Sequence, residues 1–395
     1  MQIGLVGKPN VGKSTFFGAA TMAPVEIANY PFTTIAANKG VAFVRSKCAC
    51  KELGVVCNPR SSACVDGIRL IPIELLDVAG LVPDAWQGKG LGNQFLDDLR
   101  QADALINVID VSGSTDIEGI YSKPGENDPM QDIDFLLDEV DHWIFNIIDK
   151  GFDRIARQIH LQGTKIESAL HERLTGLGIN ETDIHNALKD VSPPDNPQLW
   201  GDDDMYSLAK AIRIRSKPMI VAMNKADIAP ASNLKRISES GRDAVPTMAE
   251  AELALRRAEK AGLIDYMPGD KSFTIKDPSV LSEGQRKALD YIAENMKRFG
   301  GTGVQRCLEK AAYDMLGLIV CYPVEDENKY TDHDGRVLPD ALLMPRGSKA
   351  RDLAYKVHTD LGEGFIRAVN ARTKRVVGHD YQLMDGDIIK IVSKR

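Results

Sequence analysis

The first fifteen residues constrain the fold more than any other part of the chain. The apolar run Met1–Val6 leads directly into Gly7-Lys8-Pro9-Asn10-Val11-Gly12-Lys13-Ser14, which matches the G-x4-G-K-[ST] phosphate-loop pattern without a gap. Two glycines let the backbone approach a phosphate closely, Lys13 can reach the β and γ phosphates, and Ser14 can ligate Mg²⁺. A plain glycine-rich turn is the alternative, but the strand-loop-helix context favours a nucleotide site.

Two further stretches supply the parts that a γ-phosphate sensor needs. Thr33 and Thr34 follow Tyr30-Pro31-Phe32 in a stretch expected to be a loop, where a hydroxyl could reach Mg²⁺ only when the γ-phosphate is present. The strand-like run Ile68–Leu76 ends in Asp77-Val78-Ala79-Gly80. Asp77 can hold Mg²⁺ through water, and the Gly80 amide can meet the γ-phosphate. Taken alone, a threonine pair is more often a turn or cap element.

A strand end near the middle of the chain carries the residues expected to read a base. The buried-strand run Pro218–Met223 is followed by Asn224-Lys225-Ala226-Asp227. The Asp227 carboxylate can accept from guanine N1–H and the exocyclic amine, a donor pair that adenine lacks, while the Lys225 stem covers the ring. After the next strand-like run, a backbone N–H near Ala249 could reach the guanine oxygen.

These elements, in this order, resemble the Obg-like group of the translation-factor class of P-loop GTPases, which includes the YchF-like proteins. The resemblance covers most of the chain and implies a GTP/GDP switch that requires Mg²⁺. It assigns catalysis to Lys13, Thr34 and Gly80, and magnesium to Ser14, Thr34 and Asp77. The nucleotide-binding set is Gly7, Lys8, Pro9, Asn10, Val11, Gly12, Lys13, Ser14, Thr15, Asp77, Gly80, Asn224, Lys225, Asp227 and Ala249.

Two positions qualify that assignment. Gly80 is followed by Leu81, where many GTPases carry a glutamine that orients the attacking water, so we expect slow intrinsic hydrolysis. Water would then be placed by backbone, by another loop, by a partner or by K⁺ near Asn10. YchF-like proteins often lose the last aspartate of N-K-x-D and accept ATP, but Asp227 is present and favours GTP. The rival interpretations are an ATPase or kinase, and an RNA-binding protein with a regulatory nucleotide site.

Four cysteines lie close together between the Thr33-Thr34 stretch and Asp77. Cys48, Cys50, Cys57 and Cys64 are spaced C-x-C-x6-C-x6-C, and Gly54, Asn58-Pro59 and Gly67 interrupt the stretch. Four thiolates on such a loop could close a tetrahedral Zn²⁺ site, although the spacing is not one of the usual C-x2-C pairs. Free thiols and a reversible disulfide remain the alternatives.

The rest of the chain predicts an α/β P-loop NTPase domain with a mostly parallel, Rossmann-like sheet, a helical insertion and a C-terminal α+β domain. We expect the first part of the GTPase domain at 1–127, with a cysteine loop at 45–67, the insertion at 128–215 as a hairpin of two long helices, and the second part at 216–317 with helices at 250–262 and 282–316. Residues 318–395 resemble the ubiquitin-like TGS domain through Gly347-Ser348-x-x-Arg351-Asp352 and Val357–Leu361. A catalytic role for His358 is disfavoured, since a lone histidine on a short helix is usually structural or solvated.

The distribution of charged and apolar residues indicates which partners the chain can bind. The net charge is −7, yet residues 345–395 carry 11 Lys and Arg against 6 Asp and Glu. Arg367, Arg372, Lys374 and Arg375 lie beside the apolar Phe365, Ile366 and Val369, which we expect to be buried, so the cations should project together toward RNA. We therefore expect ribosome or RNA contacts through the TGS domain and the insertion. No run of about 18 apolar residues predicts a membrane span, and we expect a cytoplasmic monomer.

Overall fold

The computed structural model describes residues 1–22, 38–78, 80 and 98–394, and these fall into two compact units. The first unit contains Met1–Met22, Asn38–Gly40 and Leu75–Cys307, and the second contains Val41–Glu74 and Leu308–Arg395. Residues 41–74, including the cysteine loop, thus group with the C-terminal unit, whereas the sequence-based boundaries assign them to the GTPase domain.

The first unit is built on a parallel sheet, as predicted. Strands β1 (Gln2–Val6), β5 (Ala104–Asp110), β6 (Met219–Asn224) and β7 (Ala244–Pro246) pair in parallel in the order β1-β5-β6-β7. The end of β4 (Ile68–Asp77) lies on the other side of β1, with β2 (Lys39–Lys47) next to it. Every residue of β5 is buried, which is why these strands read as continuous apolar runs. The carboxyl ends of four strands therefore meet at one edge, where ligands of open α/β sheets bind.

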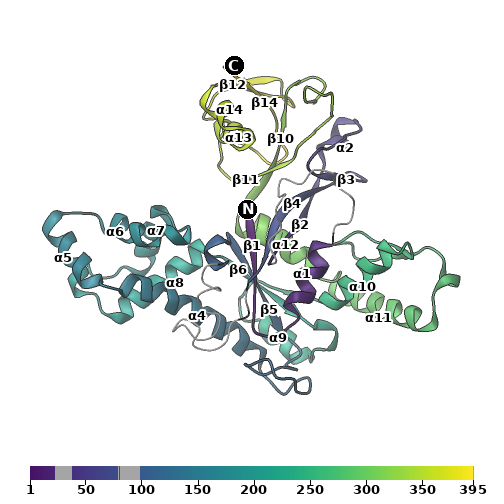
Figure 1. Ribbon diagram of the computed structural model, residues 1–395, viewed down its shortest axis with the longest axis horizontal. Coiled ribbons are helices and arrows are strands. Elements are labelled where there is room, and N and C mark those ends of the chain that lie inside the picture. The colour runs from purple at the N-terminus through teal and green to yellow at the C-terminus, as the bar shows by residue number, and fades with distance from the viewer. Residues whose placement is uncertain (23–37, 79, 81–97, 395) are drawn as a thin grey trace. The chain divides into compact units, whose positions relative to one another are not determined.

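The insertion contains five helices instead of the two that were predicted. They are α4 (Pro129–Asp149), α5 (Phe152–Gln162), α6 (Ile166–Leu174), α7 (Glu181–Val191) and α8 (Asp202–Ser216). The predicted second helix, along the stripe from Ile155 to Leu174, is broken because Gly163 adopts a left-handed conformation and ends α5. Farther along, Gly178 is also left-handed, and Asn180 starts α7 with a capping box. Val140, Ile144 and Leu208 join the core beside the sheet, and Figure 1 shows α4 to α8 extending to one side of it.

Figure 1 shows α1 (Lys13–Thr21), α10 (Ala249–Lys260) and α11 (Glu283–Phe299) on the other side from the insertion, with α1 against α10. Helix α9 (Ala231–Ser238) lies against β7. The predicted helix over 282–316 is wrong in one respect, since Gly300 and Gly301 have positive φ and end α11 before α12 (Val304–Glu309). A π-helical turn, Lys310–Met315, follows α12. Two short strands, β8 (Ile264–Asp265) and β9 (Thr274–Ile275), form a hairpin between α10 and α11. In the described part of the chain, no helix is long and apolar enough to cross a membrane.

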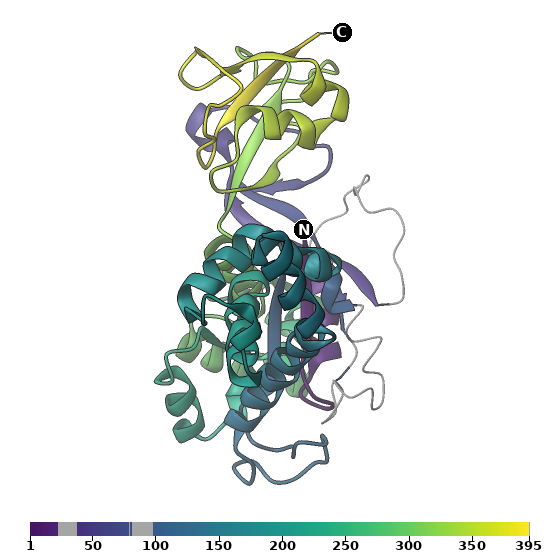
Figure 2. The same ribbon diagram turned by 90° about the vertical axis from the view of Figure 1, so that its left-hand side faces the viewer.

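The second unit contains a five-stranded mixed sheet in the order β11-β10-β14-β12-β13. Its strands are β10 (Leu318–Val324), β11 (Leu342–Pro345), β12 (Phe365–Asn370), β13 (Arg375–Val377) and β14 (Ile388–Ser393). Helix α13 (Ala350–Val357) buries Ala350 and Leu353 against Ile319, Ala368 and Ile389, and Figure 2 shows it with α14 (Thr359–Glu363) beside the strands. His358 caps α14, because its Nδ1 accepts from the Asp360 N–H at 3.2 Å. The predicted α+β architecture is confirmed, and His358 is an exposed residue whose side chain makes this capping contact.

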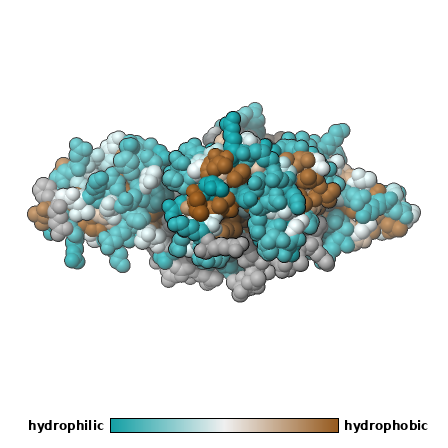
Figure 3. Space-filling model, turned by 90° about the horizontal axis from the view of Figure 1, so that it is seen from above, coloured by the Kyte–Doolittle hydropathy of each residue, from teal (hydrophilic) through white to brown (hydrophobic). Residues whose placement is uncertain are grey.

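The surface of the second unit departs from the predicted burial pattern. Ile366, expected to be buried, is 51% exposed, because a register shift between Phe365 and Arg367 breaks the alternation of β12. The predicted cation group is also divided. All four cations are exposed, but Arg372 donates to the Glu52 carboxylate at 2.6 Å and Lys374 donates to the Glu327 carbonyl. Figure 3 shows a mainly hydrophilic face with separate hydrophobic areas.

The segment from Cys48 to Val65, here called the cysteine arm, leaves β2 and returns into β4. It contains one short helix, α2 (Ala49–Leu53), and one short strand, β3 (Ala63–Val65), which pairs antiparallel with β4. Cys48 is the N-cap residue of α2, and Gly54 ends that helix with a left-handed conformation. The arm has little regular structure of its own for the number of residues it contains.

Candidate nucleotide site

The phosphate loop has the strand-loop-helix form that the sequence predicts. Gly7 (φ 151°) and Gly12 (φ 93°) both adopt conformations that favour glycine, and each lies against a neighbour. A Cβ on Gly7 would lie 2.4 Å from the Val108 carbonyl oxygen, and one on Gly12 would lie 2.3 Å from Asn224 Nδ2. Helix α1 starts at Lys13 with the Phe16 N–H donating to the Gly12 carbonyl at 2.9 Å. The loop shape therefore requires glycine at both positions.

The Lys13 side chain brings the phosphate loop and the end of β4 together. Its Nζ donates to the Asp77 carboxylate and, at 2.6 Å, to the Val78 carbonyl. A Cβ on Gly80 would lie 3.7 Å from the Gly7 carbonyl oxygen, so Gly80 also borders the loop. Ser14, in the first turn of α1, is exposed. A carboxylate, a hydroxyl and a lysine cation thus gather beside a loop of backbone amides, which suits a magnesium-bound triphosphate.

Lys8 has a structural side chain, and its place in the nucleotide-binding set stays a prediction. Its Nζ is buried and donates to Asp132 Oδ1 at 2.7 Å and to the Thr115 carbonyl at 2.9 Å. Burial raises the pKa of Asp132 to about 6 even though Lys8 opposes the shift. The pair anchors the phosphate loop to α4, and a nucleotide could meet Lys8 only through its backbone.

Asp110 is a site residue that belongs to none of the sequence motifs. It ends β5 and accepts from Lys225 Nζ at 2.7 Å, Ser114 Oγ at 2.7 Å and Thr115 Oγ1 at 3.0 Å. Burial alone would raise the pKa of Asp110, but Lys225 and the hydroxyls outweigh burial and hold that pKa below its usual value. The available sequence signal was an acid at the end of the apolar run 105–111, because a lone acid in a buried strand needs a partner.

Lys225 connects three parts of the site. In addition to Asp110, its Nζ contacts the Asn10 carbonyl at 3.2 Å, and it lies 5.7 Å from the centre of the Tyr121 ring. The Asn10 side chain donates to the Gly119 carbonyl at 3.0 Å. The lysine stem therefore crosses from β6 toward the phosphate loop, and its head is fixed by a buried carboxylate.

Asn224 and Asp227 have different surroundings. Asn224 is buried, its Nδ2 donates to the Val11 carbonyl at 2.8 Å, and its Oδ1 accepts from the Ala249 N–H at 3.0 Å. The Ala249 amide proposed for the guanine oxygen thus has a protein acceptor here. Asp227 is half-buried and accepts from Tyr291 Oη at 3.2 Å. Burial and then the Asp227 charge raise the pKa of Tyr291, so its hydroxyl remains a donor.

Several sequence predictions lie outside the described residues. Thr33, Thr34 and Leu81 are among them, so their predicted roles stay predictions.

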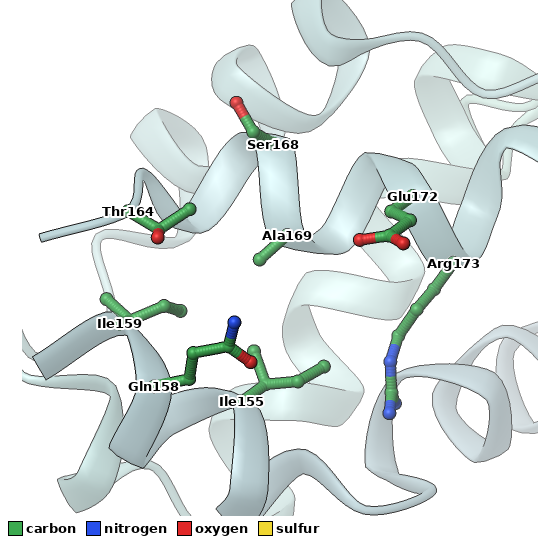
Figure 4. A pocket seen from close by; sticks show the side chains of 8 residues that line it. All are labelled: Ile155, Gln158, Ile159, Thr164, Ser168, Ala169, Glu172 and Arg173. Carbon is green, nitrogen blue, oxygen red and sulfur yellow. The ribbon is translucent and has the colours of Figure 1, made fainter. Parts of the chain in front are cut away.

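A separate hollow of about 470 Å³ lies between α5 and α6 in the insertion. Figure 4 shows Ile155 and Ile159 facing Ala169 across it, with Glu172 and Arg173 at one end. Arg173 donates to the Ile147 and Ile148 carbonyls near the end of α4, which is a structural use of that cation.

Comparison with known proteins decides the family. Residues 2–134 match the model of the 50S ribosome-binding GTPase family, residues 222–326 match the Obg-like GTPase YGR210-like, G4 motif-containing domain, and residues 329–393 match the TGS domain. An uncharacterized GTP-binding protein of Methanocaldococcus jannaschii is 56% identical over 99% of this chain and 98% of its own. The chain belongs to the Obg-like, YchF-like family of GTP-binding proteins.

Two further relatives bear on the fold and on function. The crystal structure of a GTP-binding protein from Pyrococcus horikoshii is 44% identical, covers 100% of both chains and gives a TM-score of 0.79. The ribosome-binding ATPase YchF of Bacillus subtilis is 27% identical over 98% of this chain and 97% of its own. The family assignment confirms the predicted fold class and the presence of a nucleoside-triphosphatase domain, while the choice of nucleotide differs among the names of the relatives.

Proposed function

We propose that this protein hydrolyses GTP to GDP in a Mg²⁺-dependent reaction and acts as a switch on the ribosome. The observation that carries the proposal is the meeting of Lys13, Asp77 and Gly80 beside the phosphate loop, with Asn224 holding that loop to the base-reading strand end. Phosphoryl transfer needs mainly positioning and charge stabilisation, and this edge of the sheet supplies both.

The first event in this mechanism is a change of partner for Lys13. A bound triphosphate competes with Asp77 and Val78 for the ammonium group, because its β and γ oxygens carry more charge than one carboxylate. Asp77 would then be free to hold Mg²⁺ through water, and the Ser14 hydroxyl, in the first turn of α1, would be a direct ligand. When bound, Mg²⁺ neutralises phosphate charge.

Hydrolysis is slow in this proposal because a leucine follows Gly80 in the sequence. Leucine cannot orient water, so the Gly80 amide and the Thr34 hydroxyl stabilise the γ-phosphate while the water is placed by backbone, by a partner or by K⁺ near Asn10. A faster reaction in KCl than in NaCl at equal ionic strength supports the cation, and equal rates contradict it.

Guanine is favoured over adenine by Asp227. Tyr291 donates to Asp227 Oδ2, which leaves the other carboxylate oxygen to accept from the base. The competing candidate is an ATPase, favoured by the name of the Bacillus subtilis relative. Hydrolysis assays with GTP and ATP at equal concentrations separate the two. Faster turnover and tighter binding with GTP support our proposal, whereas a preference for ATP assigns the ATPase activity instead.

Ribosome association is supported by the name of the same relative, and we propose that the TGS domain and the helical insertion contribute the RNA contacts. A ribosome-bound factor would act in the cytoplasm. The test is co-sedimentation with ribosomes of the protein loaded with a non-hydrolysable GTP analogue, with GDP, or without nucleotide. A switch requires different binding in at least two of these states, and equal binding in all three contradicts it.

A further inference from the structure

The strongest unassigned feature is the convergence of four thiols in the cysteine arm. Cys48 and Cys57 have sulfurs 3.8 Å apart, Cys50 and Cys64 also have sulfurs 3.8 Å apart, and all four sulfurs lie within 4.8 Å of one another. The cysteines come from the start of α2, from its first turn, from the following loop and from β3. All four are reduced in the structure.

The sulfur separations fit metal coordination and exclude disulfides in this arrangement. A disulfide requires sulfurs about 2.05 Å apart, far less than the separations here. Four sulfurs bound to one tetrahedral ion by bonds of about 2.3 Å lie about 3.8 Å from one another. The two closest pairs have this separation, so little movement would bring all four sulfurs to a single ion.

An independent observation comes from Arg69, which is fully buried on β4 in register with Cys64 of β3. Its guanidinium donates to Ser62 Oγ at 3.0 Å and to the Leu338 carbonyl at 2.9 Å, while its Nε has no partner. Among the described residues, no carboxylate forms an ion pair with Arg69. A buried cation without a counter-charge is strongly unfavourable. A zinc ion with four thiolates carries two net negative charges and would supply that counter-charge.

We propose that Cys48, Cys50, Cys57 and Cys64 bind one structural zinc ion, which holds the cysteine arm in the shape that contacts the TGS domain. Binding converts up to four thiols to thiolates and releases their protons to solvent, with no change of oxidation state. Four protein ligands fill the tetrahedral shell, so the site is closed to substrate and serves structure. Thiolate ligands in this geometry favour zinc over magnesium or calcium.

The contacts that depend on the arm lie within the second unit. The Asn58 N–H donates to the Val337 carbonyl at 3.1 Å, Arg60 pairs with Asp340 at 2.5 Å, and Ser61 Oγ donates to Asp340 at 2.8 Å. Glu52 of α2 accepts from Arg372 at 2.6 Å. The arm residues that make these contacts lie between the metal ligands along the chain. Because the arm has so little regular structure, the ion would fix all of these contacts at once.

The first experiment is metal analysis of the full-length protein purified without chelator or added metal. We expect about one zinc per chain, as for a closed four-cysteine site, and loss of most of it in Cys57→Ser and in Cys64→Ser. Cys321→Ala is the matched control, because Cys321 is a buried cysteine of the same unit that lies outside the cluster. This variant should keep its zinc. Replacement by Co²⁺ should give the absorption bands of tetrahedral thiolate coordination.

Further outcomes decide against the proposal. Protein that contains no zinc and takes up none on titration overturns it, as does iron held by the same cysteines or a disulfide within the cluster found by mass spectrometry. Hydrogen exchange covers the case in which a serine variant fails to fold. Removal of zinc from the wild type should raise exchange in residues 48–65 and 337–340, and unchanged exchange there contradicts the structural role.

Discussion

The phosphate loop and the cysteine arm are both connections between strands, but different forces hold them in shape. The phosphate loop follows the buried strand β1 and is held by two side-chain hydrogen bonds. Asn224 donates to the Val11 carbonyl, and Asn10 donates to the Gly119 carbonyl. The cysteine arm has a five-residue helix and a three-residue strand, and its Val56 is 90% exposed. The first region is shaped by a protein core before any ligand arrives, whereas we infer that the second takes its shape from its ligand.

This difference sets the expected response to losing a ligand. Apolar burial stabilises a preformed site whether or not nucleotide is bound, so the phosphate loop should keep its conformation without nucleotide. Metal-binding free energy is folding free energy where little core exists, so the cysteine arm should loosen when zinc is removed. Nucleotide binding and zinc binding should therefore be separable, and each prediction below tests that separation.

The largest effect is expected from Lys13→Ala. Removing the cation that stabilises the β and γ phosphates should lower hydrolysis by about a thousandfold or more, because preorganised charge supplies most of the rate in such sites. Zinc content should not change. Lys150→Ala, an exposed lysine after α4, is the control and should be as active as wild type. A Lys13 variant that keeps its activity would show that the loop is not the catalytic site.

The next effect concerns the pH dependence of the sheet that carries the phosphate loop. Burial lowers the pKa of Lys217 to about 8 from 10.5, and its Nζ donates to the Ala102 carbonyl at 2.6 Å. Between pH 8 and 10.5 the unfolded chain binds a proton that the folded protein does not, so stability rises with pH through this window. Between pH 8 and 10.5 the free energy of unfolding of the wild type should therefore rise by up to about 3 kcal/mol more than that of Lys217→Met.

Chemical denaturation of both proteins at several pH values measures this difference, with and without a zinc chelator. The gain should be the same under both conditions if the two regions are independent. Parallel stability curves for wild type and Lys217→Met across the window would contradict the buried, proton-releasing lysine. A gain that disappears on zinc removal would show that the cysteine arm supports the nucleotide sheet.

A tenfold effect is expected in base selection. Affinity for GDP should exceed that for ADP by at least about tenfold, or about 1.4 kcal/mol, and Asp227→Glu should erode the preference by misplacing the carboxylate. Tyr291→Phe removes the donor to Asp227 and should reduce the preference less, since the carboxylate itself remains. Calorimetry with both nucleotides measures this, and equal affinities for GDP and ADP in the wild type would favour the ATPase.

The two regions also differ in how far the sequence predicts them. The phosphate loop, the strand end with Asp77 and N-K-x-D could all be predicted, because each motif encodes a backbone shape on a buried strand. Asp110 was missed since an aspartate in an apolar run shows no partner until Lys225 reaches it. The structural role of the Lys8 side chain was missed for a similar reason, since its partner Asp132 is distant in sequence.

At the level of the fold, helical periodicity found the insertion but overestimated helix length, because left-handed glycines such as Gly163 end helices without interrupting an apolar stripe. The TGS domain was identified from its motifs, yet the bulge at Phe365 and Arg367 exposed Ile366 against the expected alternation. The cysteines were identified as candidate ligands, but their unusual spacing could not show that the four sulfurs converge. Convergence depends on the pairing of β3 with β4.

The smallest effect, and the one that most sharpens the comparison within the second unit, concerns its cations. Arg367 and Arg375 are exposed on β12 and β13, while Arg372 is paired with Glu52 of the cysteine arm. Replacing Arg367 and Arg375 by serine should weaken binding to ribosomes or structured RNA modestly and lower the salt slope of log affinity by about two, one for each lost phosphate contact. Arg372→Ser should leave the slope nearly unchanged, since its cation already has a protein partner, and should instead loosen the arm as seen by hydrogen exchange. Binding measured across a salt series separates the two variants. Equal slopes for the wild type and the double variant would exclude this edge of the sheet and make the helical insertion the better candidate for the RNA contact.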